Sequence, residues 1–379
     1  MQTRRQWFTS ATAAVAVLAD TRPARAATPA GPVAIARCRD YGPALLPTLQ
    51  SLMEQLGGLA PLVRHKTVSV KINLTGSPRE RMGAVPAERA QYTHPAVIGS
   101  LVRLLSDAGA RRVRLLEGAW STGDPLEEFM YDAGWDPAAL LNAGPRVEMQ
   151  NTNVAGPARR YHRLLAPSPG FLYDGFDLNH AYDECDVMVS ISKLKEHATC
   201  GITLGMKNLF GITPVTIYGD HAGKDEPAPE ATGGRGMILH SGRRQPSASA
   251  PQEKASNGPK DDKWRVPRIV VDLCAARPFH LSIIDGIATM AGGEGPWNRG
   301  VRPVTPGLLV AGLGMVETDA VGAALMGFDP LASRGQTPFE SCDSTLELAE
   351  ARGLGTRDLA RIDIRGARLP ELRFSFRRA

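Results

Sequence analysis

Apolar and polar positions along the chain predict strands and amphipathic helices in turn. Residues 67–74 (TVSVKINL) alternate β-branched with polar side chains, as half-buried strands do. An apolar stripe at helical spacing follows Pro95, with Thr93 as the expected cap and Gly109 as the expected end. Residues 111–117 (RRVRLLE) then predict a second strand. A strand, a helix and a strand in this order form a β-α-β unit, and such units build parallel sheets.

The rest of the chain continues this alternation. Residues 186–192 (DVMVSIS) are almost continuously apolar, which predicts a buried central strand. Residues 201–212 predict a helix with loose, glycine-containing ends. The other expected elements are helices that begin at Asp124 or span 266–276, 318–326 and 346–352, and strands over 146–152, 280–285, 308–312 and 361–364. The expected fold class is α/β, with a mostly parallel sheet or sheets flanked by helices in Rossmann-like three-layer units.

One α/β domain is expected over residues 27–379, with 33–184 and 185–366 as candidate subdomains. Residues 222–264 are rich in Gly, Pro, Ser, Lys and Asp. This composition disfavours a packed core, so we expect a flexible, partly disordered surface insertion there.

The amino terminus has the features of an export signal. Arg4 and Arg5 are adjacent and precede two bulky apolar residues, and a weakly apolar run spans 11–19. That run is too short to cross a bilayer, which needs about 20 apolar residues. Residues 24–26 (ARA) form a cleavage site. We therefore predict a twin-arginine signal peptide over 1–26, a periplasmic mature protein, and the twin-arginine translocase and signal peptidase as partners. An ordinary secretory signal and a basic amphipathic helix are the alternatives.

The formal net charge of +5 is concentrated at the amino terminus. Four arginines and one aspartate in residues 1–26 carry +3 of it, which leaves about +2 on the mature chain. A nearly neutral protein has no electrostatic attraction for nucleic acid, so we expect no such partner. No later segment is apolar over the length of a bilayer, so the mature form is expected not to be embedded in a membrane.

Residue spacing also limits the cofactors that the chain could hold. None of the five cysteines stands in a CxxC or similar cluster, so no iron–sulfur cluster is expected. A metal and an organic cofactor stay open, and no HExxH or HxH spacing supports the metal. The residues that could together supply nitrogen and oxygen ligands are His197, His221, Asp285, Glu294 and Asp319.

Polar residues gather where the predicted strands end. They are Lys71, Asn73, Glu117, Lys193, Lys195, His197 and Asp285. In open parallel sheets, ligands bind at the edge formed by the carboxyl ends of the strands. If the strands share one direction, these side chains converge there.

The segment 192–197 (SKLKEH) is the richest part of this group. If it is extended, Lys193, Lys195 and His197 point to one side. Two ammonium groups and an imidazole suit a phosphate, a carboxylate or an enolate-like intermediate. The next helix adds Lys207 and Asn208, and the amino end of that helix favours an anion. A solvated lysine loop is the alternative.

These patterns predict a division of roles. The expected substrate-binding residues are Lys71, Asn73, Lys193, Lys195, Lys207, Asn208 and Glu294. His197 or His221 would move protons, because imidazole titrates near neutral pH. Asp285 would orient a histidine or bind a metal.

Five segments together resemble a known family. They are 71–74 (KINL), 93–118 (THPAVIGSLVRLLSDAGARRVRLLEG), 191–212 (ISKLKEHATCGITLGMKNLFGI), 283–296 (IIDGIATMAGGEGP) and 317–330 (ETDAVGAALMGFDP). They occur in the order found in domain-of-unknown-function family 362 (DUF-362), and the resemblance covers about 33–366.

The resemblance implies little about activity, because the family is largely uncharacterised. Many members carry ferredoxin-type cysteine clusters, and this chain resembles a twin-arginine-exported member that lacks that module. Where members often have a charged residue before the last helix, this chain has 312–315 (GLGM). The resemblance supports a role for Lys193, Lys195, His197, Lys207, Asn208, His221, Asp285 and Asp319.

The leading hypothesis is a periplasmic enzyme that acts on a small anionic substrate bearing a phosphate or carboxylate. A metal or an organic cofactor would assist it. The second hypothesis is a non-catalytic periplasmic binding protein for an anion, a metal or a cofactor, and the third is a structural partner of a redox complex.

Overall fold

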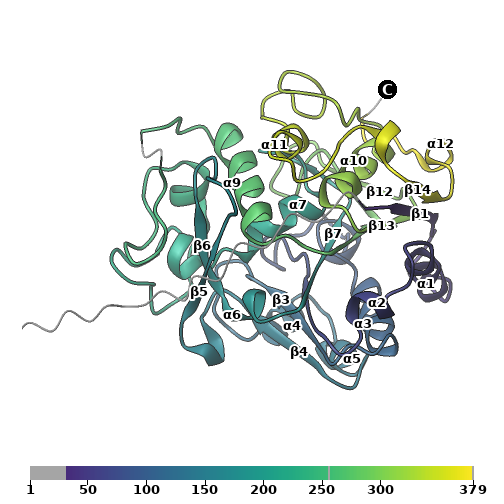
Figure 1. Cartoon of the computed structure of the whole chain (residues 1–379), viewed down its shortest axis with the longest axis horizontal. Helices are drawn as coiled ribbons and strands as arrows, with labels where there is room; N and C mark the ends of the chain where they lie inside the picture. Colours follow the sequence, from purple (N-terminus) through teal and green to yellow (C-terminus); the bar gives the residue numbers. More distant parts are fainter. Residues whose placement is uncertain (1–30, 255–256, 378–379) are drawn as a thin grey trace, which may run out of the picture.

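An eight-stranded sheet forms the centre of the molecule (Figure 1). The computed structural model describes residues 31–254 and 257–377, so the signal peptide expected at 1–26 lies outside the described residues. The strands, in order across the sheet, are β14 (Ile364–Gly366), β1 (Val33–Arg37), β13 (Leu308–Gly312), β10 (Leu281–Gly286), β7 (Val187–Lys193), β2 (Thr67–Lys71), β3 (Arg112–Glu117) and β4 (Val147–Asn151). All run in one direction except β13, which is antiparallel to both neighbours. The predicted α/β class is confirmed.

Helices pack against both faces of this sheet. One face contacts α1 (Leu45–Gln55) and α3 (Pro95–Asp107). The other contacts α7 (Leu204–Asn208) and α10 (Met315–Leu325), and α9 (Asp262–Ala276) packs outside α7. Successive residues of a strand therefore enter different cores. In β10, Ile283 belongs to the α1 and α3 side and Ile284 to the α7 side.

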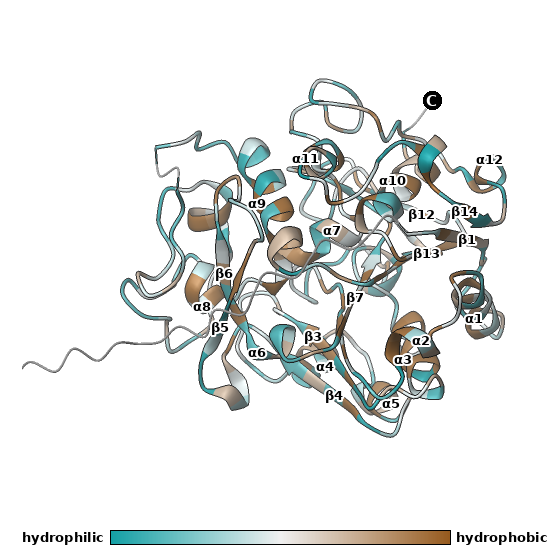
Figure 2. Ribbon diagram, viewed as in Figure 1, coloured by the Kyte–Doolittle hydropathy of each residue, from teal (hydrophilic) through white to brown (hydrophobic). Residues whose placement is uncertain are grey.

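Shorter elements complete the described chain. The helices are α2 (Ala60–Val63), α4 (Leu126–Asp132), α5 (Pro137–Leu141), α6 (His180–Asp183), α8 (Val215–Tyr218), α11 (Thr345–Ala351) and α12 (Leu369–Leu372). The strand pairs are β5 (Tyr161–Leu165) with β6 (Gly175–Asn179), β8 (Glu196–His197) with β9 (Gly201–Ile202), and β11 (Thr289–Ala291) with β12 (Arg302–Val304). Several strands carry both hydrophobic and hydrophilic segments, and α9 has hydrophilic turns beside hydrophobic ones (Figure 2). Within the described ranges, no helix has the length and apolarity that a membrane span requires.

The single helix predicted over 201–212 is wrong. The chain forms β9, α7 and a 3-10 turn over Leu209–Ile212 instead. Gly201 and Leu204 have φ angles of 71° and 46°, in the left-handed region. A continuous right-handed helix cannot pass through such residues.

Some predicted boundaries also differ from the structure. The cap of α3 is His94, whose Nδ1 accepts the N–H of Ala96, whereas the predicted cap Thr93 is buried. β2 ends at Lys71 rather than at residue 74. The last strand spans 364–366, three residues later than its predicted start.

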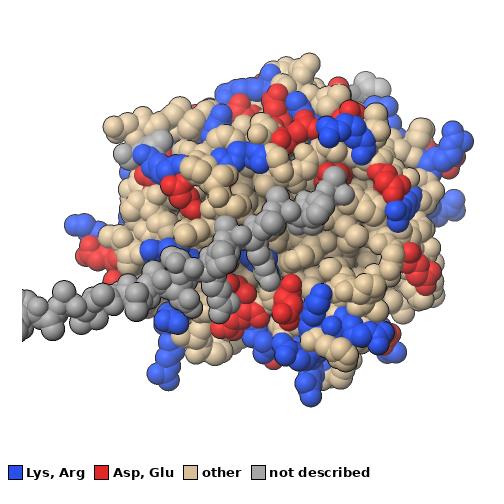
Figure 3. Space-filling view, viewed as in Figure 1, with Lys and Arg blue, Asp and Glu red and all other residues tan. Residues whose placement is uncertain are grey.

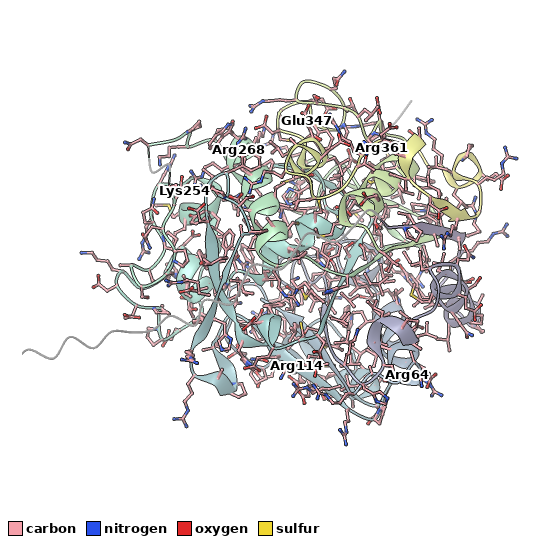
Figure 4. The ribbon with its side chains drawn as sticks, viewed as in Figure 1. Arg64, Arg114, Lys254, Arg268, Glu347 and Arg361 are labelled. Atoms are coloured by element: carbon pink, nitrogen blue, oxygen red, sulfur yellow. The ribbon has the colours of Figure 1, made fainter. Side chains whose placement is uncertain are left out.

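The described parts of the segment predicted as an insertion, 222–254 and 257–264, lie at the left of Figure 1, and residues 262–264 form the start of α9. In its described part, residues Gly236–His240 form a π-helical turn that contacts α9. Lys254, labelled in Figure 4, donates hydrogen bonds to the carbonyl of Gly170 and to Asp174 Oδ1. Glu253 forms two hydrogen bonds with the Arg265 guanidinium, at 2.7 and 2.6 Å. Both side chains of this pair are 0% exposed.

We predict that Glu253→Gln destabilises the fold. The change leaves the Arg265 cation buried without its carboxylate, which costs about 3–5 kcal/mol in comparable buried pairs. Urea unfolding of the variant measures the loss. Asp107→Asn is the matched control, because Asp107 pairs with Arg103 at the surface and the same change should have little effect there. Equal losses in the two variants would contradict the prediction.

Candidate functional site

A cavity of about 520 Å³ opens beside the carboxyl ends of β2 and β3. The strand ends supply Lys71 and Glu117, and α7 supplies Lys207 and Asn208. Two chain segments that are distant in sequence complete the wall, one within residues 220–240 and one within 294–297. The cavity therefore lies at the sheet edge where the sequence predicts a ligand site.

Lys71 forms a buried ion pair in this cavity. Its Nζ lies 2.6 Å from Glu117 Oε1 and also donates to the carbonyl of Ile72. Burial lowers the pKa of Lys71, and the neighbouring Glu117 carboxylate opposes that shift. The second oxygen of Glu117 accepts the N–H of Leu74. The charges of Lys71 and Glu117 are thus matched to each other.

Asn208 joins three segments of the site. Its Oδ1 accepts hydrogen bonds from Lys71 and Asn73 at 3.2 and 3.0 Å. Its Nδ2 lies within hydrogen-bond distance of the carbonyls of Lys71 and Ile191 and of the Ser190 hydroxyl. The hydrogen-bonding groups of Asn208 are therefore occupied by other parts of the protein, and Asn208 acts as a positioning residue.

Asn73 differs from Asn208 in one respect. Its Nδ2 donates to Asn208 and to the Thr75 hydroxyl. Its Oδ1 is buried and accepts no hydrogen bond from the described residues. Asn73 therefore has an unused acceptor beside the cavity.

Two cations in the cavity lack an acidic partner among the described residues. Lys207 Nζ lies 4.3 Å above the ring centroid of Phe210, and no described carboxylate is within ion-pair distance of it. Arg235 donates only to neutral acceptors, the carbonyl and hydroxyl of Thr213 and Oδ1 of Asn153. Burial lowers the pKa of Lys207 and lowers that of Arg235 to about 10. An anion in the cavity would offset the cost of burying both charges.

His197 lines the cavity. Its Nδ1 accepts the N–H of Thr199 at 3.1 Å, so in the neutral ring the proton is on Nε2. Burial, together with the positive charge of Lys207, lowers the pKa of His197 well below 6.5. The side chain is therefore a neutral hydrogen-bond donor at neutral pH.

Glu294 lies beside His197, with Oε2 3.9 Å from Nδ1. Its oxygens accept the N–H of Ala198 and the indole N–H of Trp297, each at 2.9 Å. Burial alone would raise the pKa of Glu294, but the two N–H donors, together with the positive charge of the His197 ring when it is protonated, lower it. Glu294 is thus an ionised residue whose oxygens are already in use.

The structure brings six predicted site residues together around the cavity and places four elsewhere. The six are Lys71, Asn73, His197, Lys207, Asn208 and Glu294. Lys193 and Asp285 pair at 2.8 Å on the opposite face of the sheet, where Tyr41 donates to Asp285. Strand alternation explains this, since Ile191 and Ile283 point to that face and so do the residues two positions later.

Lys195 and His221 also lie outside the cavity lining. Lys195 Nζ donates to the carbonyl of Gln91 and to the hydroxyl of Thr75, and Thr75 does line the cavity. Burial lowers the pKa of Lys195 well below its ordinary value. His221 is exposed, and its Nδ1 lies 3.1 Å from the Thr232 hydroxyl.

Asp319 holds the amino end of α7. Its carboxylate accepts the N–H groups of Gly205 and Met206 at 2.8 and 2.9 Å, and burial raises its pKa to about 7. No three His, Cys, Asp or Glu residues in the described ranges lie close enough together to hold a metal ion. The residues that the sequence suggested as metal ligands, Asp319 among them, thus do not form one site.

The residues of the cavity wall that sequence reasoning missed include Arg235, Trp120 and Trp297. Arg235 stands in a glycine-rich stretch that predicts a surface insertion, so its pattern gave no signal. The tryptophans follow the strand-end residue Glu117 and the loop residue Glu294 by three positions each. Their place after a strand or in a glycine-rich loop is a signal that could have been used.

We predict that His197 stays neutral, with its proton on Nε2, down to pH values well below 6.5. The unfolded chain takes up a proton below about pH 6.5, whereas the folded chain does not, so stability falls as the pH drops below that value. Nitrogen-15 NMR of the imidazole measures the tautomer, and His197→Gln assigns its signal. Urea unfolding of the same variant should show a weaker fall in stability between pH 7.5 and 5.0. A signal that titrates near pH 6.5 would refute this description.

Comparison with known proteins identifies relatives of the chain. Residues 68–324 match the model of the family described as domain of unknown function (DUF362). A thylakoid-associated protein of Synechocystis sp. is 26% identical over 304 residues, which cover 79% of this chain and 75% of that protein.

Two solved structures also match. A protein from Thermotoga maritima has a TM-score of 0.35 at 15% identity, over 68% of this chain and 52% of its own. The lactate racemase apoprotein of Thermoanaerobacterium thermosaccharolyticum has a TM-score of 0.35 at 12% identity, over 73% of this chain and 54% of its own. The chain thus spans about half the length of each. With a family model that matches most of its length, this chain belongs to the DUF362 family.

Proposed function

We propose that this protein is an enzyme that binds the phosphate or carboxylate of a small substrate in the cavity at the ends of β2 and β3. The observation that carries the proposal is the pair of cations, Lys207 and Arg235, which face the cavity without an acidic partner among the described residues. Ammonium and guanidinium groups in a partly desolvated site form strong, charge-assisted hydrogen bonds with oxyanions.

Four carboxylates also line the cavity, on Glu80, Glu117, Asp220 and Glu294, and among the described residues none of them is within ion-pair distance of Lys207 or Arg235. Glu117 is paired with Lys71 and accepts a backbone N–H. Glu294 accepts two N–H groups, and Asp220 accepts the N–H of Met237. Each of the four thus accepts a hydrogen bond from the protein, Glu80 from the N–H of Ser77, whereas Lys207 makes no hydrogen bond with the described residues and Arg235 makes none through Nη1.

The site can also stabilise charge that develops during a reaction. In this proposal the neutral imidazole of His197 donates its Nε2–H to an oxyanion of the substrate and needs no prior deprotonation. Burial lowers the pKa of Lys207, whereas an anion bound beside it would raise that pKa, so in this proposal Lys207 holds the anion as a cation. In this proposal Lys207 and His197 act on the substrate, and Lys71, Asn73 and Asn208 position them.

The residues outside the cavity have supporting parts in this proposal. The Lys193–Asp285 pair fixes the ends of β7 and β10 from the other face of the sheet. Lys195 acts through the Thr75 hydroxyl. His221, which is exposed, has no contact with the cavity lining among its described hydrogen bonds.

A second candidate function is a non-catalytic binding protein for an anion, a metal or a cofactor. The observation that favours it is the use of His197 Nδ1 as an acceptor for Thr199, which leaves a proton on the nitrogen that a general base would need free. Turnover of a substrate that the wild-type protein binds would exclude this candidate. A metal would need ligands from the substrate itself, because no described trio of ligating residues converges.

We predict that Lys207→Met and Arg235→Met each weaken the binding of inorganic phosphate about tenfold or more. A hydrogen bond to a charged group contributes roughly 1.5–3 kcal/mol, so one lost contact accounts for that change. Isothermal titration calorimetry measures the affinity. Lys224→Met is the matched control, because Lys224 is exposed outside the cavity lining and its loss should leave the affinity unchanged. Wild-type affinity in both cavity variants would sink the proposal.

The proposed site of action is the periplasm, reached through the twin-arginine translocase. Residues 4 and 5 carry this proposal, since the twin-arginine machinery reads an adjacent arginine pair. Replacing Arg4 and Arg5 with lysine should therefore abolish export, as measured by fractionation of cells that produce the full chain. The control replaces Arg22 and Arg25 with lysine and should still be exported. Export of the first variant, or export in cells without the translocase, would overturn the assignment.

A further inference from the structure

The cavity is larger than a bare anion requires. A volume of about 520 Å³ lies within the range of roughly 300–1,000 Å³ that is typical of sites for drug-sized ligands. The unpaired cations Lys207 and Arg235 account for only part of its lining. The chemical character of the remaining wall therefore indicates which groups the ligand carries besides its anion.

Trp297 forms one part of that wall and is held in a defined orientation. Its indole N–H donates to Glu294 Oε1, and the other oxygen of Glu294 lies beside His197. The six-membered ring lies over Gly76 and Gly295, where an added Cβ would come within 2.4 and 2.2 Å of ring atoms. The side chain is nevertheless 43% exposed. A fixed aromatic ring is thus available to a ligand close to His197.

Trp120 and Phe210 supply further ring surface. Trp120 is 45% exposed, and its ring lies close to Gly234, where an added Cβ would be 2.9 Å from it. Phe210 lies beneath the Lys207 ammonium. Single exposed apolar residues are common on protein surfaces. Two exposed tryptophans that line the same cavity as two unpaired cations form a more specific arrangement.

We infer that the substrate carries its anionic group on a flat aromatic ring, which stacks on Trp297 and Trp120 while the anion reaches Lys207 and Arg235. This inference rests on the proposed function and narrows its substrate class to aryl or heteroaryl phosphates and carboxylates. Indole rings stack favourably on other aromatic rings in offset geometry, which gives the ring a role distinct from that of the anion.

The test compares matched ligands on the folded, full-length mature protein. Phenyl phosphate is paired with methyl phosphate, and benzoate with acetate, and calorimetry measures each affinity. The aryl member of at least one pair should bind about tenfold more tightly, at the low end of what stacking on an aromatic side chain contributes. Trp297→Leu and Trp120→Leu should each reduce this advantage and leave the affinity for the methyl compound unchanged.

Two further variants separate this inference from the proposed function. Lys207→Met should weaken both members of a pair by a similar factor, because it removes the contact with the anion. Tyr131→Leu, at an exposed aromatic residue outside the cavity, should change neither member. Equal affinities within both pairs, or an aryl advantage that survives both tryptophan changes, would overturn the inference and leave the anion site intact. If none of the four compounds binds, the proposed function fails together with it.

Discussion

The position of α7 depends on two polar side chains, and the site depends on α7. A helix of five residues makes too few internal hydrogen bonds to be stable alone. Asp319 accepts two N–H groups at its amino end, and Asn208 ties its carboxyl end to β2 and β7. With both ends fixed, Lys207 is held over Phe210 and toward the cavity.

The buried lysines at the ends of these strands differ in whether a carboxylate lies close to the ammonium group. Lys193 and Lys71 are both buried and both have a carboxylate within 2.8 Å. Within the described part of the chain, Lys195 has only neutral acceptors, and Lys207 has only an aromatic ring. Because a buried cation without a counter-ion is costly, Lys207 is the lysine whose surroundings a bound anion improves most directly. Figure 3 shows acidic and basic side chains interspersed on one face of the molecule.

The sequence was sufficient to predict the central strands and the edge at which polar residues gather. Period-two and continuous apolar patterns identified β2, β3 and β7, because the burial of these strands is reflected in their own local sequence. The prediction that Lys193, Lys195 and His197 share one side assumed an extended chain over all three residues, but β7 ends at Lys193. Beyond that residue the chain turns into the β8–β9 hairpin, so alternation no longer applies.

The remaining part of the site could not be predicted, because it depends on contacts between distant segments. Arg235 reaches the cavity only because its chain segment folds back against Thr213 and Asn153. Gly118 permits this approach, since an added Cβ would lie 2.5 Å from the carbonyl of Gly211 and 3.0 Å from Arg235. No local periodicity encodes such a contact.

The cavity thus has two parts with different physical origins. Lys71, Asn73 and Asn208 are held at the sheet edge by hydrogen bonds among themselves, so that part is fixed by the fold. Trp120 and Trp297 stand on connecting segments and pack against glycines. Loops tolerate change more readily than strand ends do. A change in the loops would therefore alter the aromatic part of the wall, while the hydrogen bonds among Lys71, Asn73 and Asn208 at the sheet edge would stay in place.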